Sequence, residues 1–269
     1  MSKVILILSD GLRNDTAADQ MGYLEHLVEA SLATRRVVIA ELPTMSRPLY
    51  ETLHTGLPVS SHGITGNRVV RRSTVPNVFD LAVKHSMTTA ASAHHWFSEL
   101  YNRCPYDPAT DREVDDSSLL IQHGRFYSDD ATPDSEVIAS GAMLVQKFAP
   151  DYTLIHLSGM DLVGETHGGG SSEYRRHASK QDALFAAHIP TWLRDGYVTL
   201  VTADHGVSDD AHHGGALVDV RHVPLYVIKP GVGGEGDTKQ VVSQLGIAPS
   251  ICSLLGVPVP ESMVGARIA

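Results

Sequence analysis

Short runs of consecutive apolar residues recur along the chain, and several end at a polar residue or a glycine. Because such a strand is apolar on both faces, the pattern is typical of parallel strands covered on both sides. We expect strands at residues 4–8, 37–40, 88–93, 152–157, 197–201 and 223–228.

Segments with helical spacing of apolar residues separate these strands. We expect helices from about residue 15, after Ser46, and at residues 78–84, 135–148, 173–194 and 247–255. Strands that alternate with helices predict a doubly wound, mainly parallel sheet with helices on both faces, an α/β fold. No internal repeat interrupts this order, so residues 1–269 are interpreted as a single domain.

Three stretches do not fit the alternation. Residues 101–135 are polar and irregular, with several prolines and aspartates, and we interpret them as a lid or substrate-binding insert. Residues 159–170 are interpreted as a glycine-rich loop and 231–237 as a flexible one. The segment from residue 237 onward is expected to serve packing.

The composition limits the kinds of partner that the protein is expected to bind. With 21 Lys and Arg against 31 Asp and Glu, the formal net charge is -10, which argues against nucleic acid. A small phosphate ester can still bind where metal ions reverse the local charge.

The two distant cysteines fit a reducing compartment. No apolar run approaches the ~20 residues of a membrane helix, and residues 4–8 are too short for a signal peptide, so we expect no membrane partner and a cytoplasmic location.

Polar side chains follow three of the predicted strands. Asp10 follows the first strand, Asp161 lies beyond the strand at 152–157, and Asp204 and His205 follow the strand at 197–201. The carboxyl ends of parallel strands meet at one edge of a sheet, where open α/β folds bind ligands. Each aspartate alone could cap a helix, and each histidine could be an ordinary surface residue. Four such coincidences on one edge are improbable, so we interpret the set as metal ligands.

Two polar residues elsewhere have more than one interpretation. Ser46 lies where a helix begins, so it could be a nucleophile near free backbone N–H groups or an N-cap serine. Asn67 could contact a phosphoryl oxygen or occupy a left-handed turn, and the composition of its loop favours the turn. Glu165 and His167 share the glycine-rich segment with Asp161 and could complete a metal shell.

The order of motifs resembles that of the alkaline phosphatase superfamily, and within it the type I phosphodiesterase and nucleotide pyrophosphatase group. The fold that this implies is alkaline phosphatase-like. The motifs that carry the resemblance are Asp10-Gly11, Pro43-Thr44-Met45-Ser46-Arg47-Pro48, Thr55-Gly56, His62-Gly63-Ile64 with Asn67, Asp161 with Gly164, Asp204-His205-Gly206 and His213-Gly214.

The resemblance implies two divalent metal ions, zinc first and manganese as the alternative. One would be held by Asp10, Asp204 and His205, with Ser46 bound as the nucleophile; the other would be held by Asp161, His213 and one residue of the following segment. Asn67 matches the asparagine that contacts the phosphoryl group. The family usually places histidine directly after the glycine of Asp-x-x-Gly. Here that position is Glu165, with His167 two residues further on, and either could be the ligand.

We therefore expect a two-metal phosphodiesterase or nucleotide pyrophosphatase that acts through a phosphoserine on a small phosphate ester, for which a nucleotide is one candidate. Serine stands where the nucleotide pyrophosphatases most often have threonine, which leaves the substrate class open. A phosphomonoesterase or phosphonate hydrolase on the same site is the alternative. A non-catalytic domain that binds metal and phosphate esters is a third hypothesis, from another class.

Overall fold

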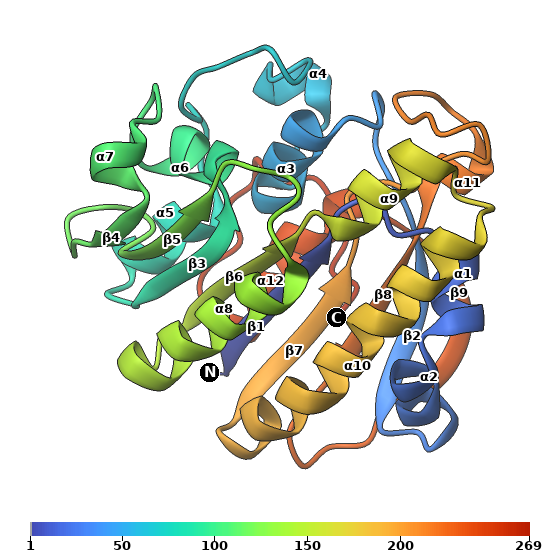
Figure 1. Cartoon of the computed structure of the whole chain (residues 1–269). Coiled ribbons are helices and arrows are strands. Elements are labelled where there is room, and N and C mark those ends of the chain that lie inside the picture. Colours follow the sequence, from blue (N-terminus) through green and yellow to red (C-terminus); the bar gives the residue numbers. More distant parts are fainter. Residues whose placement is uncertain (1) are drawn as a thin grey trace.

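A single nine-stranded sheet runs through the molecule in the order β4-β5-β3-β6-β1-β7-β8-β2-β9 (Figure 1). The computed structural model describes residues 2–269. Parallel pairing joins β5, β3, β6, β1 and β7, whereas β4 and β8 run in the opposite direction. The strands are β1 (Lys3–Ser9), β2 (Ala33–Ile39), β3 (Thr89–His94), β4 (Glu113–Asp115), β5 (His123–Tyr127), β6 (Tyr152–Leu157), β7 (Tyr197–Thr202), β8 (His222–Ile228) and β9 (Gly236–Ser243).

Helices cover both faces of the sheet. Figure 1 shows α8 and α10 in front of the strands. The helix α12 packs against β1 and also contacts α3 and α5. The expected doubly wound, mainly parallel α/β fold is confirmed. The helices are α1 (Asn14–Gln20), α2 (Gly22–Glu29), α3 (Ser46–Thr55), α4 (Val59–His62), α5 (Val78–Lys84), α6 (His95–Tyr101), α7 (Pro108–Asp111), α8 (Asp134–Phe148), α9 (Gly159–His167), α10 (Ser172–Arg194), α11 (Val218–Arg221), the 3-10 turn η1 (Gln244–Gly246) and α12 (Ile247–Leu255).

The three central strands of the sheet are deeply buried. Every residue of β6 and β7 is buried, and so is every residue of β1 after its first. These strands lie side by side in the order β6-β1-β7, all parallel. Their carboxyl ends therefore open at one edge, as the sequence predicts for the candidate metal ligands.

Residues 101–135 contain more regular structure than the sequence indicates. They include α7, and β4 and β5 extend the sheet beyond β3. The expectation of an irregular stretch was wrong at these strands, because β4 has three residues and two exposed acids, and thus little apolar signal. The end of the segment still reaches the carboxyl edge, where Ser158 Oγ donates to the carbonyl of Asp130 at 3.0 Å.

Two further expectations were wrong for β2 and β9, the last two strands in the order of the sheet. β2 begins at Ala33 rather than at residue 37, and β9 occupies a segment in which the sequence predicts only a loop and packing. The polar residues that hid these strands are paired across them: Arg35 forms an ion pair of 3.3 Å with Asp237. β9 is the edge strand, and its open side favours polar residues, whereas β2 lies between β8 and β9.

Candidate metal centre

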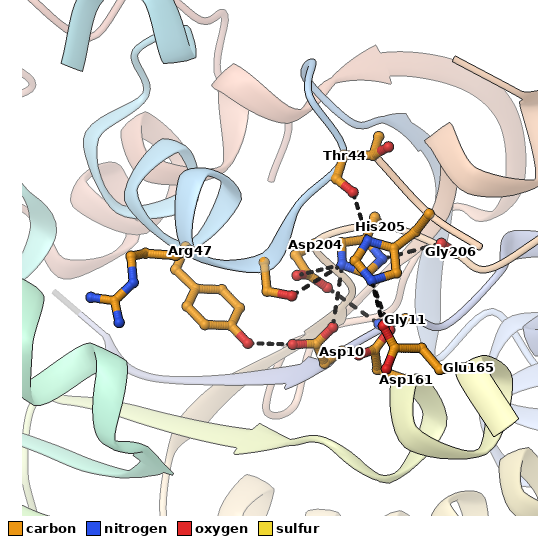
Figure 2. A network of polar contacts seen from close by, with 12 residues as sticks. Asp10, Gly11, Thr44, Arg47, Asp161, Glu165, Asp204, His205 and Gly206 are labelled. Carbon is orange, nitrogen blue, oxygen red and sulfur yellow. Dashed lines mark hydrogen bonds and ion pairs between the residues drawn. The ribbon is translucent and has the colours of Figure 1, made fainter. Parts of the chain in front are cut away.

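The predicted metal ligands meet at the carboxyl edge of the central strands (Figure 2). Asp10 directly follows β1, Asp204 and His205 follow β7, and Asp161 lies in the first turn of α9, just after β6. Asp10 is 3% exposed, Asp204 and His205 are 0% exposed, and Asp161 is half-buried. The edge thus collects acidic and imidazole groups from segments about 150 and 40 residues apart in sequence, an arrangement that adjacent parallel strands dictate.

These side chains form two groups that could each hold a metal ion. Ligand atoms of Asp10, Asp204 and His205 all lie within 4.8 Å of one another, and so do those of Asp161, His205 and His213. The imidazole of His205 belongs to both groups, so the two candidate positions are neighbours. The rings of His205 and His213 stack with their centroids 4.1 Å apart.

The backbone fixes which nitrogen each imidazole turns inward. His205 Nδ1 donates to the carbonyl of Gly206 at 3.1 Å, and His213 Nδ1 donates to the carbonyl of Thr44 at 2.9 Å. In both rings Nε2 then faces the carboxylates: His205 Nε2 lies 3.4 Å from Asp204 Oδ2, and His213 Nε2 lies 3.8 Å from Asp161 Oδ1. This arrangement is typical of metal-binding histidines, whose second nitrogen is held by another group.

Ser46 is the first residue of α3, and its side chain turns into this centre. Its Oγ lies 3.3 Å from His205 Nε2, and Ser46 is 5% exposed. The N-cap position of α3 belongs to Met45, and no side chain caps the helix. The N-cap alternative for Ser46 is therefore not what the structure shows; its hydroxyl lies instead between the helix N-terminus and the ligand groups.

Glu165 and His167 occupy different positions on α9, which replaces the expected glycine-rich loop. Glu165 Oε1 lies 2.9 Å from His213 Nε2. His167 is exposed at the end of α9, and its side chain makes no hydrogen bond or ion pair within residues 2–269. The structure thus brings Glu165 to the second ligand group and leaves His167 outside it.

Asn67 lies beside α3, the helix that begins at Ser46. Its Oδ1 accepts the backbone N–H of Arg47 at 3.1 Å, and its backbone is outside the left-handed region that the composition of its loop favours. The Arg47 side chain points away from the centre, as Figure 2 shows, and its Nη2 pairs with Glu99 at 2.7 Å. The amide oxygen of Asn67 therefore anchors this residue beside the start of α3, whereas the Arg47 side chain does not reach the site.

Unpartnered oxygen atoms test whether the residues fit metal ions. Asp10 Oδ1, Asp161 Oδ1 and Asp204 Oδ2 are buried and have no hydrogen-bond partner. Buried carboxylate oxygens without partners cost several kcal/mol each by order of magnitude, and a cation would supply the missing interaction. Carboxylate and imidazole donors suit zinc and also manganese, so the residues present fit the implied group.

Burial and neighbouring charges also shift the pKa values of Asp161, Asp204 and His213. Burial raises the pKa of Asp161 and of Asp204 well above the usual range, and the negative charge of Asp10 raises both further. Burial lowers the pKa of His213, but its hydrogen bond with Glu165 and the charge of Asp161 outweigh that effect and raise the pKa to about 9. The two ligand groups thus hold carboxyl groups that repel one another, as expected where a bound cation completes the site.

Two residues that the sequence analysis did not single out contact Asp10. Tyr50 Oη donates to Asp10 Oδ2, and His156 Nε2 lies 3.1 Å from the same oxygen. The sequence does place Tyr50 near the site, because residues four positions apart share a helix face and Tyr50 is four residues after Ser46. For His156 the signal was a lone histidine inside an otherwise apolar strand.

Comparison with known proteins shows the fold and the family of the chain. Its fold is that of the alkaline phosphatase superfamily: murine ectonucleotide pyrophosphatase / phosphodiesterase 5 superimposes with a TM-score of 0.75 at 13% identity, over 96% of each chain. The chain belongs to the type I phosphodiesterase / nucleotide pyrophosphatase family, whose model matches residues 4–223. The resemblance inferred from the motifs is confirmed.

Other relatives share parts of this architecture. The catalytic subunit of human GPI ethanolamine phosphate transferase 2 is 24% identical over 99% of this chain, which spans only 28% of that protein's length. A phosphonate monoester hydrolase from Silicibacter pomeroyi has a TM-score of 0.68 at 15% identity, over all of this chain and 76% of its own. The family indicates an enzyme of the phosphoester hydrolase type, and the two ligand groups fit the divalent-metal dependence of the superfamily.

Proposed function

We propose that the protein hydrolyses phosphate diesters or pyrophosphates with two divalent ions, zinc first and manganese as the alternative. Asp10, Asp204 and His205 would hold one ion; Asp161, Glu165 and His213 would hold the other. The observation that carries the proposal is Ser46 Oγ at 3.3 Å from His205 Nε2, at the start of α3 and beside both ligand groups.

The chemistry follows from how the residues are placed. Bound divalent ions would lower the pKa of a coordinated hydroxyl and offset charge on the phosphoryl group. Ser46 Oγ attacks phosphorus, the bond to the leaving oxygen breaks, and a phosphoserine forms. A water molecule then displaces Ser46 and releases the phosphate product. Asn67 and the backbone N–H of Ser46, the first residue of α3, would stabilise charge on the phosphoryl oxygens.

Replacing the nucleophile tests the covalent mechanism. Ser46→Ala should lower kcat by about a thousandfold or more, while metal content measured by mass spectrometry stays unchanged. The exposed Ser61 offers a matched control, because Ser61→Ala removes a hydroxyl outside the centre. Full turnover by Ser46→Ala would overturn the phosphoserine. Wild-type protein that binds phosphate esters and zinc or manganese but turns over none would favour the non-catalytic hypothesis.

The charge around Ser46 supports a diester over a monoester. A monoester carries additional negative charge, yet Arg47 is paired with Glu99 and the neighbouring Arg68 is exposed. We expect an aryl phosphate diester to react faster than the aryl monoester or an aryl phosphonate. A nucleotide is one candidate substrate, since an inactive variant of the murine neighbour was solved in complex with AMP. Faster turnover of the monoester or the phosphonate would favour the alternative functions.

Transfer to an alcohol is a second candidate, because the human ethanolamine phosphate transferase matches nearly the whole chain. An alcohol could displace Ser46 from phosphorus in place of water, with the same residues in the same roles. Within residues 2–269 no helix is long and apolar enough to cross a bilayer. Turnover of an aryl diester of ethanolamine phosphate with added glycerol as the acceptor alcohol separates the two reactions: ethanolamine phosphate joined to glycerol indicates a transferase, and free ethanolamine phosphate indicates a hydrolase.

A further inference from the structure

The two carboxylate oxygens of Asp10 have different surroundings. Oδ2 accepts hydrogen bonds from Tyr50 Oη and from His156 Nε2, the latter at 3.1 Å. Oδ1 is buried without a hydrogen bond and lies 3.5 Å from His205 Nε2. One oxygen is therefore fully engaged by the protein, and the other is left free toward the ligand group.

A third residue fixes the proton on His156. Tyr127 Oη lies 2.7 Å from His156 Nδ1 and 3.2 Å from the carbonyl of His156. A proton on Nδ1 alone would turn the Nε2 lone pair toward the carboxylate of Asp10, which is repulsive at 3.1 Å. Tyr127 can donate to Nδ1, or accept from it and donate to the carbonyl, and in both arrangements that satisfy the three groups Nε2–H donates to Asp10.

Both donors are held rigidly by their neighbours. The ring of Tyr50 stacks on Phe97 with centroids 4.4 Å apart and meets the ring of His156 edge-on at 4.9 Å. Tyr50 is 2% exposed and His156 is 1% exposed. Tyr50 and the nucleophile Ser46 belong to one helix, α3, so the group that orients Asp10 and the group that attacks phosphorus move together.

We infer that Tyr50 and His156 are positioning residues that make Asp10 a metal ligand through Oδ1 alone. Binding a cation through both oxygens would require breaking two buried hydrogen bonds, which is costly. A one-oxygen ligand suits the low coordination number of zinc, whereas calcium often takes carboxylates through both oxygens. The pair thus sets both the affinity of the first ligand group and its preference for a small ion. This inference rests on the proposed metal centre.

Tyr50→Phe removes the hydroxyl and keeps the ring, so it isolates the hydrogen bond from packing. Calorimetric titration of the metal-free protein with zinc and with calcium should show zinc affinity about 10- to 100-fold weaker and a smaller ratio of zinc to calcium affinity. His156→Leu should have the same effect, and His156→Gln, which restores an N–H donor of similar reach, should recover most of the loss.

Tyr152→Phe provides the matched control. Tyr152 is buried, and its hydroxyl meets His54 Nε2 at 3.0 Å rather than a metal ligand. Its zinc affinity should stay within about twofold of wild type, well short of the loss expected for the positioning pair. Zinc affinity as strong in Tyr50→Phe and His156→Leu as in Tyr152→Phe would overturn the inference. The readout needs no turnover, so wild-type protein that binds zinc but hydrolyses no ester would overturn the proposed hydrolysis alone.

Discussion

Glu165 and His167 are two residues apart, yet helical geometry separates their roles. Asp161 and Glu165 are four positions apart in α9 and therefore share a face, whereas His167, six positions from Asp161, turns away. The hydrogen bond with His213 lowers the pKa of Glu165, which keeps it ionised beside that ring. The structure thus favours Glu165 over His167 as the third group of the second centre.

Single substitutions at these two positions test this preference. Glu165→Gln removes the charge beside His213 and should weaken binding of the second ion at least about tenfold, so that purified protein carries close to one ion per chain. His167→Gln changes an exposed side chain and should leave both ions bound. Metal content by mass spectrometry reads both results. Loss of an ion in His167→Gln, with Glu165→Gln unaffected, would reverse the assignment.

The sequence predicts individual site residues where chemistry and position coincide. Asp10, Asp204 and His205 stand out because each is of a residue type that binds metals and lies just after a buried strand. Tyr50 and His156 do not, because their contact with Asp10 depends on how α3 and β6 pack. Tyr50 and His156 are 40 and 146 positions from Asp10, and no sequence pattern shows that either one pairs with that carboxylate.

At the level of elements, the turn between β1 and α1 must pass very close to α9. Gly11 has φ of +77°, and a Cβ there would lie 2.7 Å from Asp161 Cα. Gly11→Ala should therefore lower the free energy of unfolding by about 2 kcal/mol or more and push Asp161 out of place. A methyl group added at Gly22 meets nothing within 4 Å, so Gly22→Ala is the control. Urea unfolding measures both, and equal stabilities would contradict the predicted clash.

The sequence predicts the strands that are buried along their whole length. It does not predict helices and strands that are rich in glycine or polar residues. Continuous apolar runs identified β1, β6 and β7. The helix α9 was mistaken for a loop because it contains Gly159 and Gly164. A Cβ on Gly164 would lie 2.8 Å from Val207 Cγ2, so this glycine serves close packing rather than flexibility. Sequence alone does not distinguish these two uses of glycine.

For the molecule as a whole, the strand order is what assembles the centre. The alternation of strands and helices predicts that candidate ligands share an edge, but not that β6, β1 and β7 are neighbours. That order brings Asp161, Asp10 and Asp204 together, although the chain already has a net charge of -10. Folding therefore concentrates negative charge at one point, and the stability of the whole molecule should depend on what neutralises it.

Metal removal should consequently destabilise the entire fold. At a free zinc concentration 100 times Kd, one site adds about 2.7 kcal/mol, which corresponds to a rise in Tm of about 5–10 °C. Asp204→Asn removes one buried charge and one ligand. Its metal-free form should melt no lower than metal-free wild type, and its zinc-dependent rise should be smaller. Differential scanning calorimetry with zinc and with a chelator measures these Tm values. A wild-type Tm that changes with neither zinc nor the chelator would contradict a structural role for the ions.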